Sequence, residues 1–482
     1  MGTGGQNPMG NAVFSFRGMA CLTGLMLMGA GRLAAQESRS DAFLLQQRAL
    51  EEQVRAALNR ERPADQRIEY DWGGWYSFYL FLFDDGIESS RTFRQHDFRL
   101  WGSANIDQGA HEIYGRLKLQ FEDFNHGDAY DRNHDDTIGP NLDRAFYKFD
   151  LRQAARAYWN QSLDWDLSVK VGRDFVELGT GYALSMPLDH VLIVAEAAKL
   201  KATALMGTTI RSMPDIDRGR PGGGSSERNF WGGQLEYTGL QKHTPFVYGL
   251  INKDQKTEHP WVPMQNFDYD TWYVGVGSRG ELLDNLRYST EWVWEGGESF
   301  GDRHFLTTSD VEAWAFDFLL EYLSRRAMKP RIWAEYMFAS GDGGRYASPT
   351  NAIGGNTSED DTGFSAFGYR DTGLSFAPRL SNVHVWRAGA AFRPFENHEY
   401  LSNLEIGTDW FLYSKHHRDG AVSDPTANAR SNYLGWEMDY FLNWRITADL
   451  AWTTRFGTFF PGKGFDDATT RTFFLTGVTY SF

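Results

Sequence analysis

The sequence is short of three features that would each indicate a particular class of protein. It has one cysteine, Cys21, among its 482 residues, so no disulfide can form within the chain. Beyond its N-terminal segment it has no apolar run of the ~18 or more residues that a spanning helix needs, which excludes a helical membrane protein. Lys and Arg number 48 against 63 Asp and Glu, and this net charge of −15 argues against a nucleic-acid partner.

Aromatic residues and glycine are abundant instead. The chain has 17 Trp, 22 Tyr and 35 Phe, together 15% of its residues, and 50 Gly against 15 Pro. Aromatic side chains suit β-strands and the two interface girdles of a transmembrane barrel, and glycine suits turns and crowded lumens. A large soluble β-sandwich or propeller could show similar totals, so the pattern along the chain has to decide between these folds.

The N-terminal segment has the features of a secretory signal peptide. Arg17 precedes an apolar run from Met19 to Ala30, and small residues around Ala35 suit a cleavage site. Residues 1–35 are therefore predicted to be a signal peptide. The sequence that follows is polar, so a buried helix that starts in this run is the poorer interpretation.

A short helical stretch is expected after this leader. Apolar residues recur at helical spacing between Asp41 and Arg62, and Pro63 ends the pattern. We interpret residues 36–66 as a periplasmic helical lead-in, with a mobile tail as the alternative. Residues 67–482 form the remaining part, in which no change of composition marks a domain boundary.

From Ile68 onward, polar and apolar residues alternate as they do in strands with one apolar face. Between His111 and Phe121, isoleucine, leucine and phenylalanine fall on one face and charged side chains on the other. The same alternation returns over 163–171 and 434–445. Strands of ten or more residues fit a tilted membrane span better than the ~5–6 residues that are usual in soluble sheets.

The connections between these strands alternate in length. Short turns are predicted at Asp107–Ala110, Gly239–His243, Glu281–Asp284, Arg325–Lys329, Glu396–Glu399 and Ile446–Ala448. Long polar connections are predicted at Asn125–Asn141, Arg211–Arg228, Lys253–Tyr269, Gly296–Ser309, Gly341–Arg379 and Lys415–Arg430. Short periplasmic turns and long extracellular loops are typical of outer-membrane barrels. Between Leu178 and Lys199 the pattern is weakest, and two strands are placed there.

The fold class predicted from these observations is all-β. We expect a transmembrane antiparallel β-barrel of about 18 strands over residues 67–482, in the outer membrane of a diderm bacterium. The chain ends in Tyr480-Ser481-Phe482, which resembles the closing strand read by outer-membrane assembly machinery. Membrane lipid and that machinery are therefore expected partners, and nucleic acid is not.

Stretches late in the chain resemble the alginate export family of outer-membrane porins. They are Gly435–Asp439, Asn443–Thr447 and Arg455–Gly462, and the earlier Gly172-Arg173 also resembles the family pattern. The resemblance extends with gaps from about Ile68 to Phe482. It implies a monomeric barrel of eighteen strands whose charged lumen conducts an anionic polysaccharide outward past a constriction lined by arginine.

One arginine of that constriction has a counterpart in this sequence. Arg455 matches a member of the family's arginine set, whereas Thr453 and Thr458 stand where the family has further arginines. The departure bears on selectivity for a polyanion and leaves the expected fold unchanged. Arginine suits such a site because its planar guanidinium binds a carboxylate through two hydrogen bonds.

Alternate residues of a strand face the same side of the sheet. This alternation and the family pattern together indicate which charged side chains line the lumen and bind a substrate. These candidates are Arg116, Lys118, Arg144, Lys170, Arg173, Arg331, Arg387, Arg445, Arg455, Glu335, Glu437 and Asp439. Arg99 and Lys148 also fall on the strand face that is predicted to point into the lumen. Mixed rings of charge orient a solute in a channel, but opposite charges can also neutralise each other and fill the lumen with ion pairs. A constriction dominated by Arg116, Arg331, Arg445 and Arg455 would favour an exporter of polyanions.

One loop has a weak calcium signal. Asp131, Asn133 and Asp135 provide oxygen atoms at alternate positions, as in the first half of a calcium-binding loop. Leu142 stands where such a loop has its bidentate glutamate. A solvated acidic loop is the alternative interpretation, and no other cofactor is expected.

The sequence contains no Gly-x-Ser-x-Gly motif and no histidines at metal-ligand spacing, so catalysis is not expected. The leading hypothesis is passive export of an alginate-like anionic polysaccharide. The alternative is a substrate-selective uptake porin for small sugars, organic acids or peptides. The length of Gly341–Arg379 also suggests that this loop folds over or into the pore as a gate.

Overall fold

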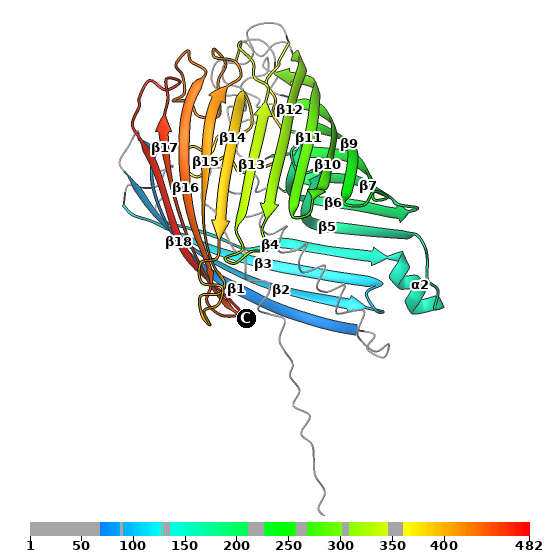
Figure 1. Cartoon of the computed structure of the whole chain (residues 1–482). Coiled ribbons are helices and arrows are strands. Elements are labelled where there is room, and N and C mark those ends of the chain that lie inside the picture. The colour runs from blue at the N-terminus through cyan, green and yellow to red at the C-terminus, as the bar shows by residue number, and fades with distance from the viewer. Residues whose placement is uncertain are drawn as a thin grey trace, which may run out of the picture.

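The structure is a computed structural model, and it describes residues 68–86, 90–126, 128, 135–210, 226–256, 268–300, 308–345 and 360–482. Within them lie an 18-stranded antiparallel sheet and one short helix (Figure 1). No helix in these ranges is long and apolar enough to cross a membrane. The elements are β1 Ile68–Asp84, β2 Arg91–Ile106, β3 His111–Phe124, β4 Asp135–Asp150, α2 Leu151–Trp159, β5 Asp166–Leu178, β6 Leu184–Ala197, β7 Leu200–Thr209, β8 Arg228–Tyr237, β9 His243–Asp254, β10 Asp270–Leu283, β11 Leu286–Phe300, β12 Thr308–Leu323, β13 Arg331–Ala339, β14 Val383–Phe392, β15 Leu404–Lys415, β16 Tyr433–Arg445, β17 Leu450–Pro461 and β18 Arg471–Ser481.

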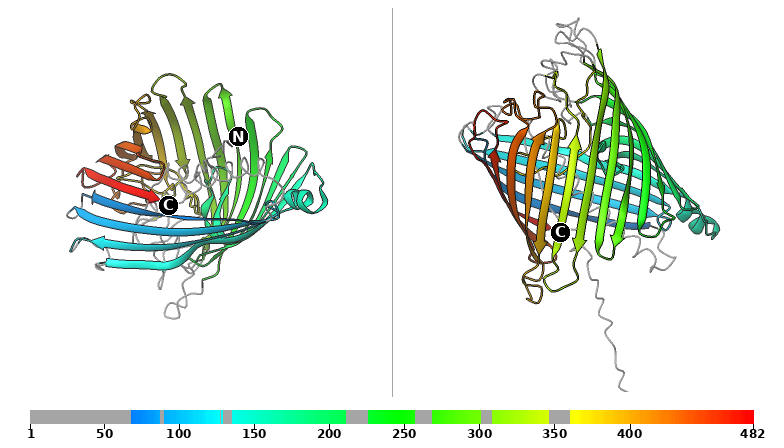
Figure 2. Two further views of the ribbon diagram at one scale, coloured as in Figure 1. Left: turned by 90° about the horizontal axis from the view of Figure 1, so that it is seen from below. Right: turned by 45° about the horizontal axis from the view of Figure 1, so that its top comes forward.

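The sheet closes into a barrel. Each strand pairs with its neighbour in sequence, and β1 also pairs with β18, from Trp75 opposite Ser481 to Asp84 opposite Thr472. Figure 2 shows the strands wrapping around a common interior, tilted relative to the barrel axis. Closure leaves no free sheet edge at the seam between the two ends of the chain, and it confirms the predicted fold class.

The alternating pattern sets which side chains face outward. On β3, Ile113 is 50% exposed and Leu119 41%, whereas Arg116 and Glu122 on the other parity are buried. Exposed apolar side chains belong on a wall that contacts lipid, and polar ones belong in the lumen. The predicted division of the strand faces is thus confirmed on this strand.

The two ends of the barrel have different connections. At one end the turns are short, such as 107–110 and 284–285, and Phe482 lies there because Ser481 N–H donates to the Asp449 carbonyl in the turn before β17. At the other end the connections include 340–382 and 416–432. The predicted alternation of short and long connections is confirmed, and short turns mark the periplasmic end.

Some boundaries differ from the prediction. The region 178–199 contains one strand, β6, because the chain before it turns into the lumen instead of crossing the wall. The connection after β3 ends at Asp135, where β4 starts, and helix α2 was not predicted. The signal peptide, the lead-in of 36–66 and the calcium candidates Asp131 and Asn133 lie outside the described residues, so those predictions stay open.

Candidate functional site

The hairpin of β5 and β6 leaves the barrel wall and enters the lumen. Pairing of β4 with β5 stops at Ala145 opposite Arg173, while β5 and β6 stay paired to Leu178 opposite Leu184. Gly172 has a φ of +133°, and a Cβ there would lie 2.2 Å from the Ala145 carbonyl oxygen. Only glycine tolerates this combination, so this residue allows the strand to turn inward.

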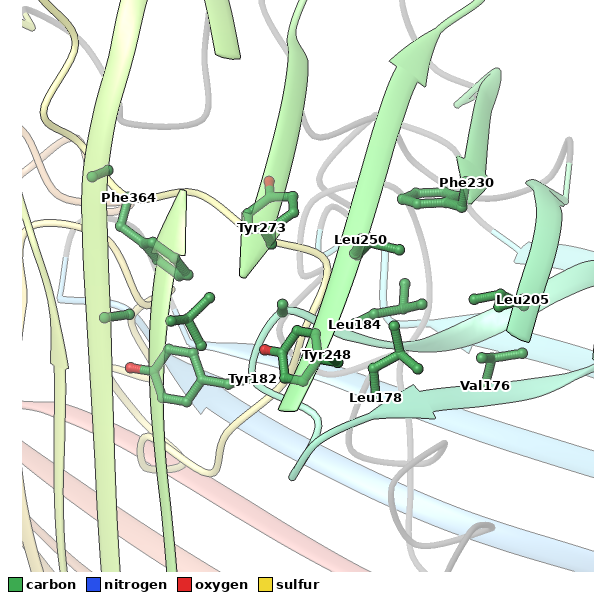
Figure 3. Packing of buried hydrophobic residues seen from close by; sticks show 14 of the residues in the cluster. Val176, Leu178, Tyr182, Leu184, Leu205, Phe230, Tyr248, Leu250, Tyr273 and Phe364 are labelled. Atoms are coloured by element: carbon green, nitrogen blue, oxygen red, sulfur yellow. The ribbon is translucent and has the colours of Figure 1, made fainter. Parts of the chain in front are cut away.

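Inside the barrel, the hairpin tip packs against the inner face of β8 and β9. Val176, Leu178 and Leu184 belong to a buried cluster with Phe230 of β8 and Leu250 of β9 (Figure 3). These strands therefore direct apolar side chains into the lumen at this height. Burial of this apolar surface stabilises the inward position of the tip.

Polar contacts fix the tip across the lumen. Gly179 N–H donates to Gln234 Oε1 at 2.6 Å, and the Tyr182 hydroxyl donates to the Phe338 carbonyl at 2.8 Å. Thr180 donates through its N–H and its hydroxyl to Glu291. The tip thus reaches β8, β11 and β13 and narrows the passage beside them.

The connection between β13 and β14 also enters the lumen in its described part, residues 360–382. Its Ser365 N–H donates to Glu295 Oε2 of β11 at 2.8 Å. Further along, Leu374 and Ser375 each donate an N–H to Glu437 Oε1 of β16 at 2.6 Å. The loop therefore crosses the interior from β11 to β16, as expected for a loop that folds into the pore.

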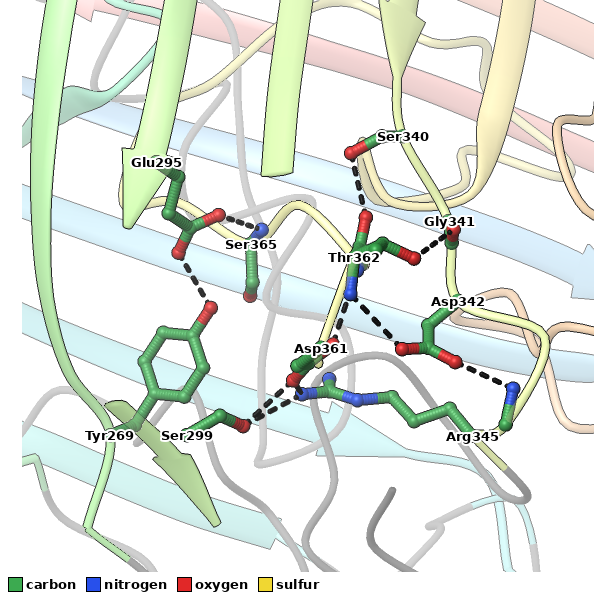
Figure 4. Close-up of polar contacts among 12 residues, drawn as sticks. Tyr269, Glu295, Ser299, Ser340, Gly341, Asp342, Arg345, Asp361, Thr362 and Ser365 are labelled. Atoms are coloured by element: carbon green, nitrogen blue, oxygen red, sulfur yellow. Dashed lines mark hydrogen bonds and ion pairs between the residues drawn. The ribbon is translucent and has the colours of Figure 1, made fainter. Parts of the chain in front are cut away.

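The root of this loop is held by a second group of polar residues (Figure 4). Arg345 forms an ion pair with Asp361, and Ser299 of β11 donates to the same carboxylate at 2.7 Å. Asp342 accepts the Thr362 N–H at 3.0 Å. Burial disfavours the charge on Arg345, but Asp361 outweighs it and raises the pKa of the guanidinium. These contacts thus hold the described residues on either side of 346–359 to β11 and to each other.

Arg370 joins the loop, the hairpin tip and the wall. Its guanidinium forms an ion pair with Asp317 of β12 at 3.2 Å, donates to the Thr180 carbonyl at 2.8 Å and lies over the Tyr182 ring. Burial lowers the pKa of Arg370, but Asp317 and Glu291 outweigh it, so that the pKa is raised. Arg370 is therefore a permanent cation within an otherwise acidic part of the lumen.

Arg387 forms ion pairs with the next group of acids along the wall. It contacts Glu335 at 3.1 Å, Asp409 at 2.6 Å and the loop residue Asp371 at 3.2 Å. Tyr413 shares Glu437 with the loop N–H groups at 3.2 Å. The carboxylates of β11 to β16 are therefore bound by the inserted loop, by arginine and by tyrosine, and we call this side of the lumen the acidic wall.

The opposite side, formed by β2 to β5, has a different arrangement. Three pairs of cations lie directly across from one another on neighbouring strands: Arg99 and Lys118, Arg116 and Arg144, Lys148 and Lys170. Like charges in directly opposed positions destabilise a sheet. We call this side of the lumen the basic wall.

Three carboxylates offset part of this charge. Asp97 contacts Arg99 at 2.8 Å, Asp143 pairs with Arg99 and Arg116, and Asp174 contacts Arg144 and Lys170 at 3.1 Å each. The guanidinium groups of Arg99 and Arg116 also lie 5.7 Å and 5.4 Å from the Trp75 ring centroid. Carboxylates and an aromatic ring therefore stabilise these buried arginines.

Lys118 and Lys148 differ from these arginines. Both are half-buried on the lumen face, and neither forms an ion pair within the described part of the chain. Glu112 lies across from Lys148 on β3. Their ammonium groups are thus the cations of the basic wall that are best placed to bind an anion from the lumen.

Comparison with known proteins decides the family. No curated protein matches the sequence. The sequence model of a family described as alginate export matches residues 220–476, more than half of the chain. The chain belongs to the alginate export family.

Solved structures show the same fold. OccK8 (OprE) of Pseudomonas aeruginosa is 12% identical, with a TM-score of 0.54 over 86% of this chain and 98% of that one. The outer membrane protein opdK of the same species is 10% identical, with a TM-score of 0.52 over 86% and 98%. A BenF-like porin of Pseudomonas fluorescens Pf-5 is 11% identical, with a TM-score of 0.50 over 86% and 98%. Together the family and the fold identify an outer-membrane channel, and they point to a channel rather than an enzyme.

In this member of the alginate export family, the predicted arginines lie at two levels. Arg331 and Arg445 lie at the periplasmic strand ends, where Arg331 contacts Glu321 at 3.3 Å and Arg445 donates to the Thr447 carbonyl at 3.3 Å. Arg116 and Arg455 lie in the middle of β3 and β17, and Arg455 lies over the Phe441 ring. The four arginines therefore do not form one constriction ring.

Most other predicted residues face the lumen. Lys118, Arg144 and Lys170 lie on the basic wall, and Arg387, Glu335, Glu437 and Asp439 lie on the acidic wall. Arg173 is a correction: it has the parity of the exposed Val171 and contacts Asp189 of β6 at 2.7 Å, so it lies on the outer face. Within the described residues, no group of three or more His, Cys, Asp or Glu side chains is placed to hold a metal.

Several lumen residues were not predicted. Asp317 and Asp409 have the inward parity of predicted strands, so face parity could have found them. Thr180 and Arg370 lie on the hairpin tip and in the loop, where no periodic pattern indicates a direction. Sequence reasoning therefore identified wall residues more readily than the residues that narrow the lumen.

Proposed function

We propose that this outer-membrane channel passes an anionic polysaccharide of the uronate type outward without an energy source of its own. The observation that carries the proposal is the basic wall, on which three pairs of like charges oppose each other. Such pairs cost stability, and a polyanion in the lumen would offset that cost. The family's description as alginate export supports the same class of substrate.

The two kinds of cation would have different roles. The buried guanidiniums of Arg99, Arg116 and Arg144 would provide a fixed positive field, because carboxylates and rings already hold them. Lys118 and Lys148 would contact the substrate carboxylates. A lysine ammonium is a compact charge on a flexible stem, so successive carboxylates could be exchanged as the polymer moves. Conduction needs this kind of weak, repeated binding.

The acidic wall would not repel such a substrate. Glu437 accepts three loop N–H groups, and Asp317 and Glu335 are held by Arg370 and Arg387. The lysines of the basic wall would then make the closest contacts with the substrate. A passive channel of this kind requires no cofactor or catalytic residue, and we propose that it works as a monomer in the outer-membrane lipid.

The test is the current through the purified, refolded chain in a planar bilayer with polyuronate added on the periplasmic side. We expect polyuronate to block the current, and Lys118→Gln/Lys148→Gln to weaken the block several-fold. Arg455→Ala, which removes a lumen cation from β17, should weaken it further. Lys242→Gln is the matched control, because Lys242 lies in an exposed periplasmic turn beside Asp284. Current that is indifferent to polyuronate would overturn the proposal.

Uptake of small anionic solutes is the second candidate. It is favoured by the hairpin tip and the loop residues 360–382, which both occupy the lumen. In the same bilayer, a monomeric uronate would then carry current while polyuronate would leave the conductance unchanged. Block by the polymer that strengthens with its chain length would favour the polysaccharide.

A further inference from the structure

Helix α2 lies outside the barrel at the periplasmic ends of β4 and β5 (Figure 1). Asp150 caps its first turn by accepting the Gln153 N–H at 2.9 Å, and Asn160 ends it in the left-handed conformation. Ala154 and Ala155 are buried. The helix thus has one face toward the barrel, while Arg156 and Trp159 on another side are exposed among the described residues.

Contacts attach the barrel-facing side of α2 to the lipid-facing wall. The Tyr158 hydroxyl lies 3.0 Å from His111 Nε2, and the other ring nitrogen of His111 lies 2.6 Å from the Tyr147 hydroxyl. Tyr158 also donates to Asp107 in the first periplasmic turn. Tyr147 is exposed on the outer face, on the parity opposite to the lumen residue Lys148. The helix therefore borders the surface that contacts the hydrocarbon of the membrane.

A stripe of cationic and aromatic side chains runs along α2, in which Arg156 and Trp159 are exposed and Arg152 is half-buried. Arg152, Arg156 and Trp159 follow one another at spacings of four and three residues, which place them along one side of a helix. Trp159 is 61% exposed, and the exposed Arg156 forms no ion pair with any described residue. Two cations beside an exposed tryptophan are typical of a helix that lies in a membrane interface.

We propose that the stripe Arg152–Arg156–Trp159 is a phospholipid-binding surface on the periplasmic leaflet of the outer membrane. The guanidiniums would bind lipid phosphates, and the indole would lie at the level of the headgroups. Two observations select lipid as the occupant. The surface continues the lipid-facing wall through Tyr158 and Tyr147, and its charge is opposite to that of phosphate.

The test is a nitroxide spin label at position 159 of the refolded chain in vesicles of phosphatidylethanolamine and phosphatidylglycerol. Trp159→Cys in a Cys21→Ser background gives one labelling position, because Cys21 is the only cysteine. The matched control is Met328→Cys, exposed in a periplasmic turn away from α2. We expect the label at 159 to be several-fold less accessible to a water-soluble nickel complex, and more accessible to oxygen, than the label at 328. Equal accessibility at both positions would overturn the proposal.

A second measurement examines the phosphate contact itself. Replacing phosphatidylglycerol by phosphatidylcholine should raise the nickel accessibility at 159, and Arg152→Gln/Arg156→Gln should abolish this dependence on lipid charge. Each arginine near an anionic surface contributes about 1 kcal/mol, or about fivefold in affinity. A difference in gel mobility between the unheated and the heated barrel would show that the variants fold. A folded double variant with the same dependence on phosphatidylglycerol would contradict phosphate binding.

Discussion

Both walls of the lumen contain charged side chains, but the side chains of the two walls have different kinds of partner. On the acidic wall, carboxylates such as Glu437 and Glu295 bind backbone N–H groups of the inserted loop. On the basic wall, cations such as Arg116 and Arg144 oppose each other across neighbouring strands, and Lys118 and Lys148 have no ion-pair partner in the described chain. The comparison shows that one wall holds the inserted loop, while the other contains two lysines that form no described ion pair.

The difference has a physical basis in what each charge can bind. A carboxylate accepts hydrogen bonds, so it can be satisfied by the N–H groups that any loop backbone provides. A cation can only donate, and it needs a carboxylate, a carbonyl or an aromatic ring. The described ion pairs of the basic wall use Asp97, Asp143 and Asp174, and they involve the arginines and Lys170. Lys118 and Lys148 lie outside these ion pairs, and Glu112 lies across from Lys148.

The largest expected effect comes from the most buried contact of the basic wall. Arg144→Met should destabilise the barrel by about 3–5 kcal/mol, because it leaves Asp174 buried with Lys170 as its remaining ion-pair partner. The measurement is the midpoint of urea unfolding in vesicles. Arg331→Met is the control, since Arg331 is partly exposed and its ion pairs should contribute about 0–1 kcal/mol. Equal losses in both variants would show that burial does not distinguish these cations.

A smaller effect is expected on the acidic wall. Glu437→Gln removes the charge that accepts the N–H groups of Leu374, Ser375 and Phe376, a loss of about 1.5–3 kcal/mol. The loop should then leave its position more often, and single-channel conductance should rise. Glu321→Gln, which affects a partly exposed pair at the periplasmic end, should leave conductance unchanged. An unaltered conductance in Glu437→Gln would show that the loop does not depend on this carboxylate.

The smallest expected effect is a difference between the two walls in how their contacts depend on salt concentration. Raising the ionic strength from about 0.1 M to 1 M shortens the Debye length from about 10 Å to about 3 Å. Binding of polyuronate to the accessible Lys118 and Lys148 should weaken several-fold, while the buried contacts of Glu437 should be affected little. The measurement is the polyuronate concentration for half-maximal block at each salt concentration. A block that does not depend on salt would mean that polyuronate binds through contacts other than charge.

The lumen-facing residues of the strands could be predicted from the sequence more completely than the segments that lie inside the lumen. Alternation identified the lumen face of β3 and placed Arg116 and Lys118 on it, because each strand residue changes side with a period of two. The same rule places Arg173 outside, with Val171, although the family pattern suggested the lumen. Face parity is therefore the stronger guide where strands are regular.

The interior elements could not be predicted in this way. The hairpin tip carries the apolar Val176 and Leu184 into the lumen, so its composition does not distinguish it from the outer wall. Loop residue Arg370 makes contacts that depend on the closed barrel, because Asp317 and Thr180 are far apart in sequence. Helix α2 could have been predicted from its capping residues, because Asp150 precedes it and Asn160 follows it.

The most direct test of the two-wall account is the reversal potential of the refolded channel in a potassium chloride gradient. We expect anion selectivity, because loop N–H groups and arginines bind carboxylates of the acidic wall while Lys118 and Lys148 form no described ion pair. We also expect Lys118→Glu/Lys148→Glu to shift the reversal potential toward that of potassium. Cation selectivity of the unaltered channel would contradict the account, since the carboxylates of the acidic wall would then determine the field in the lumen.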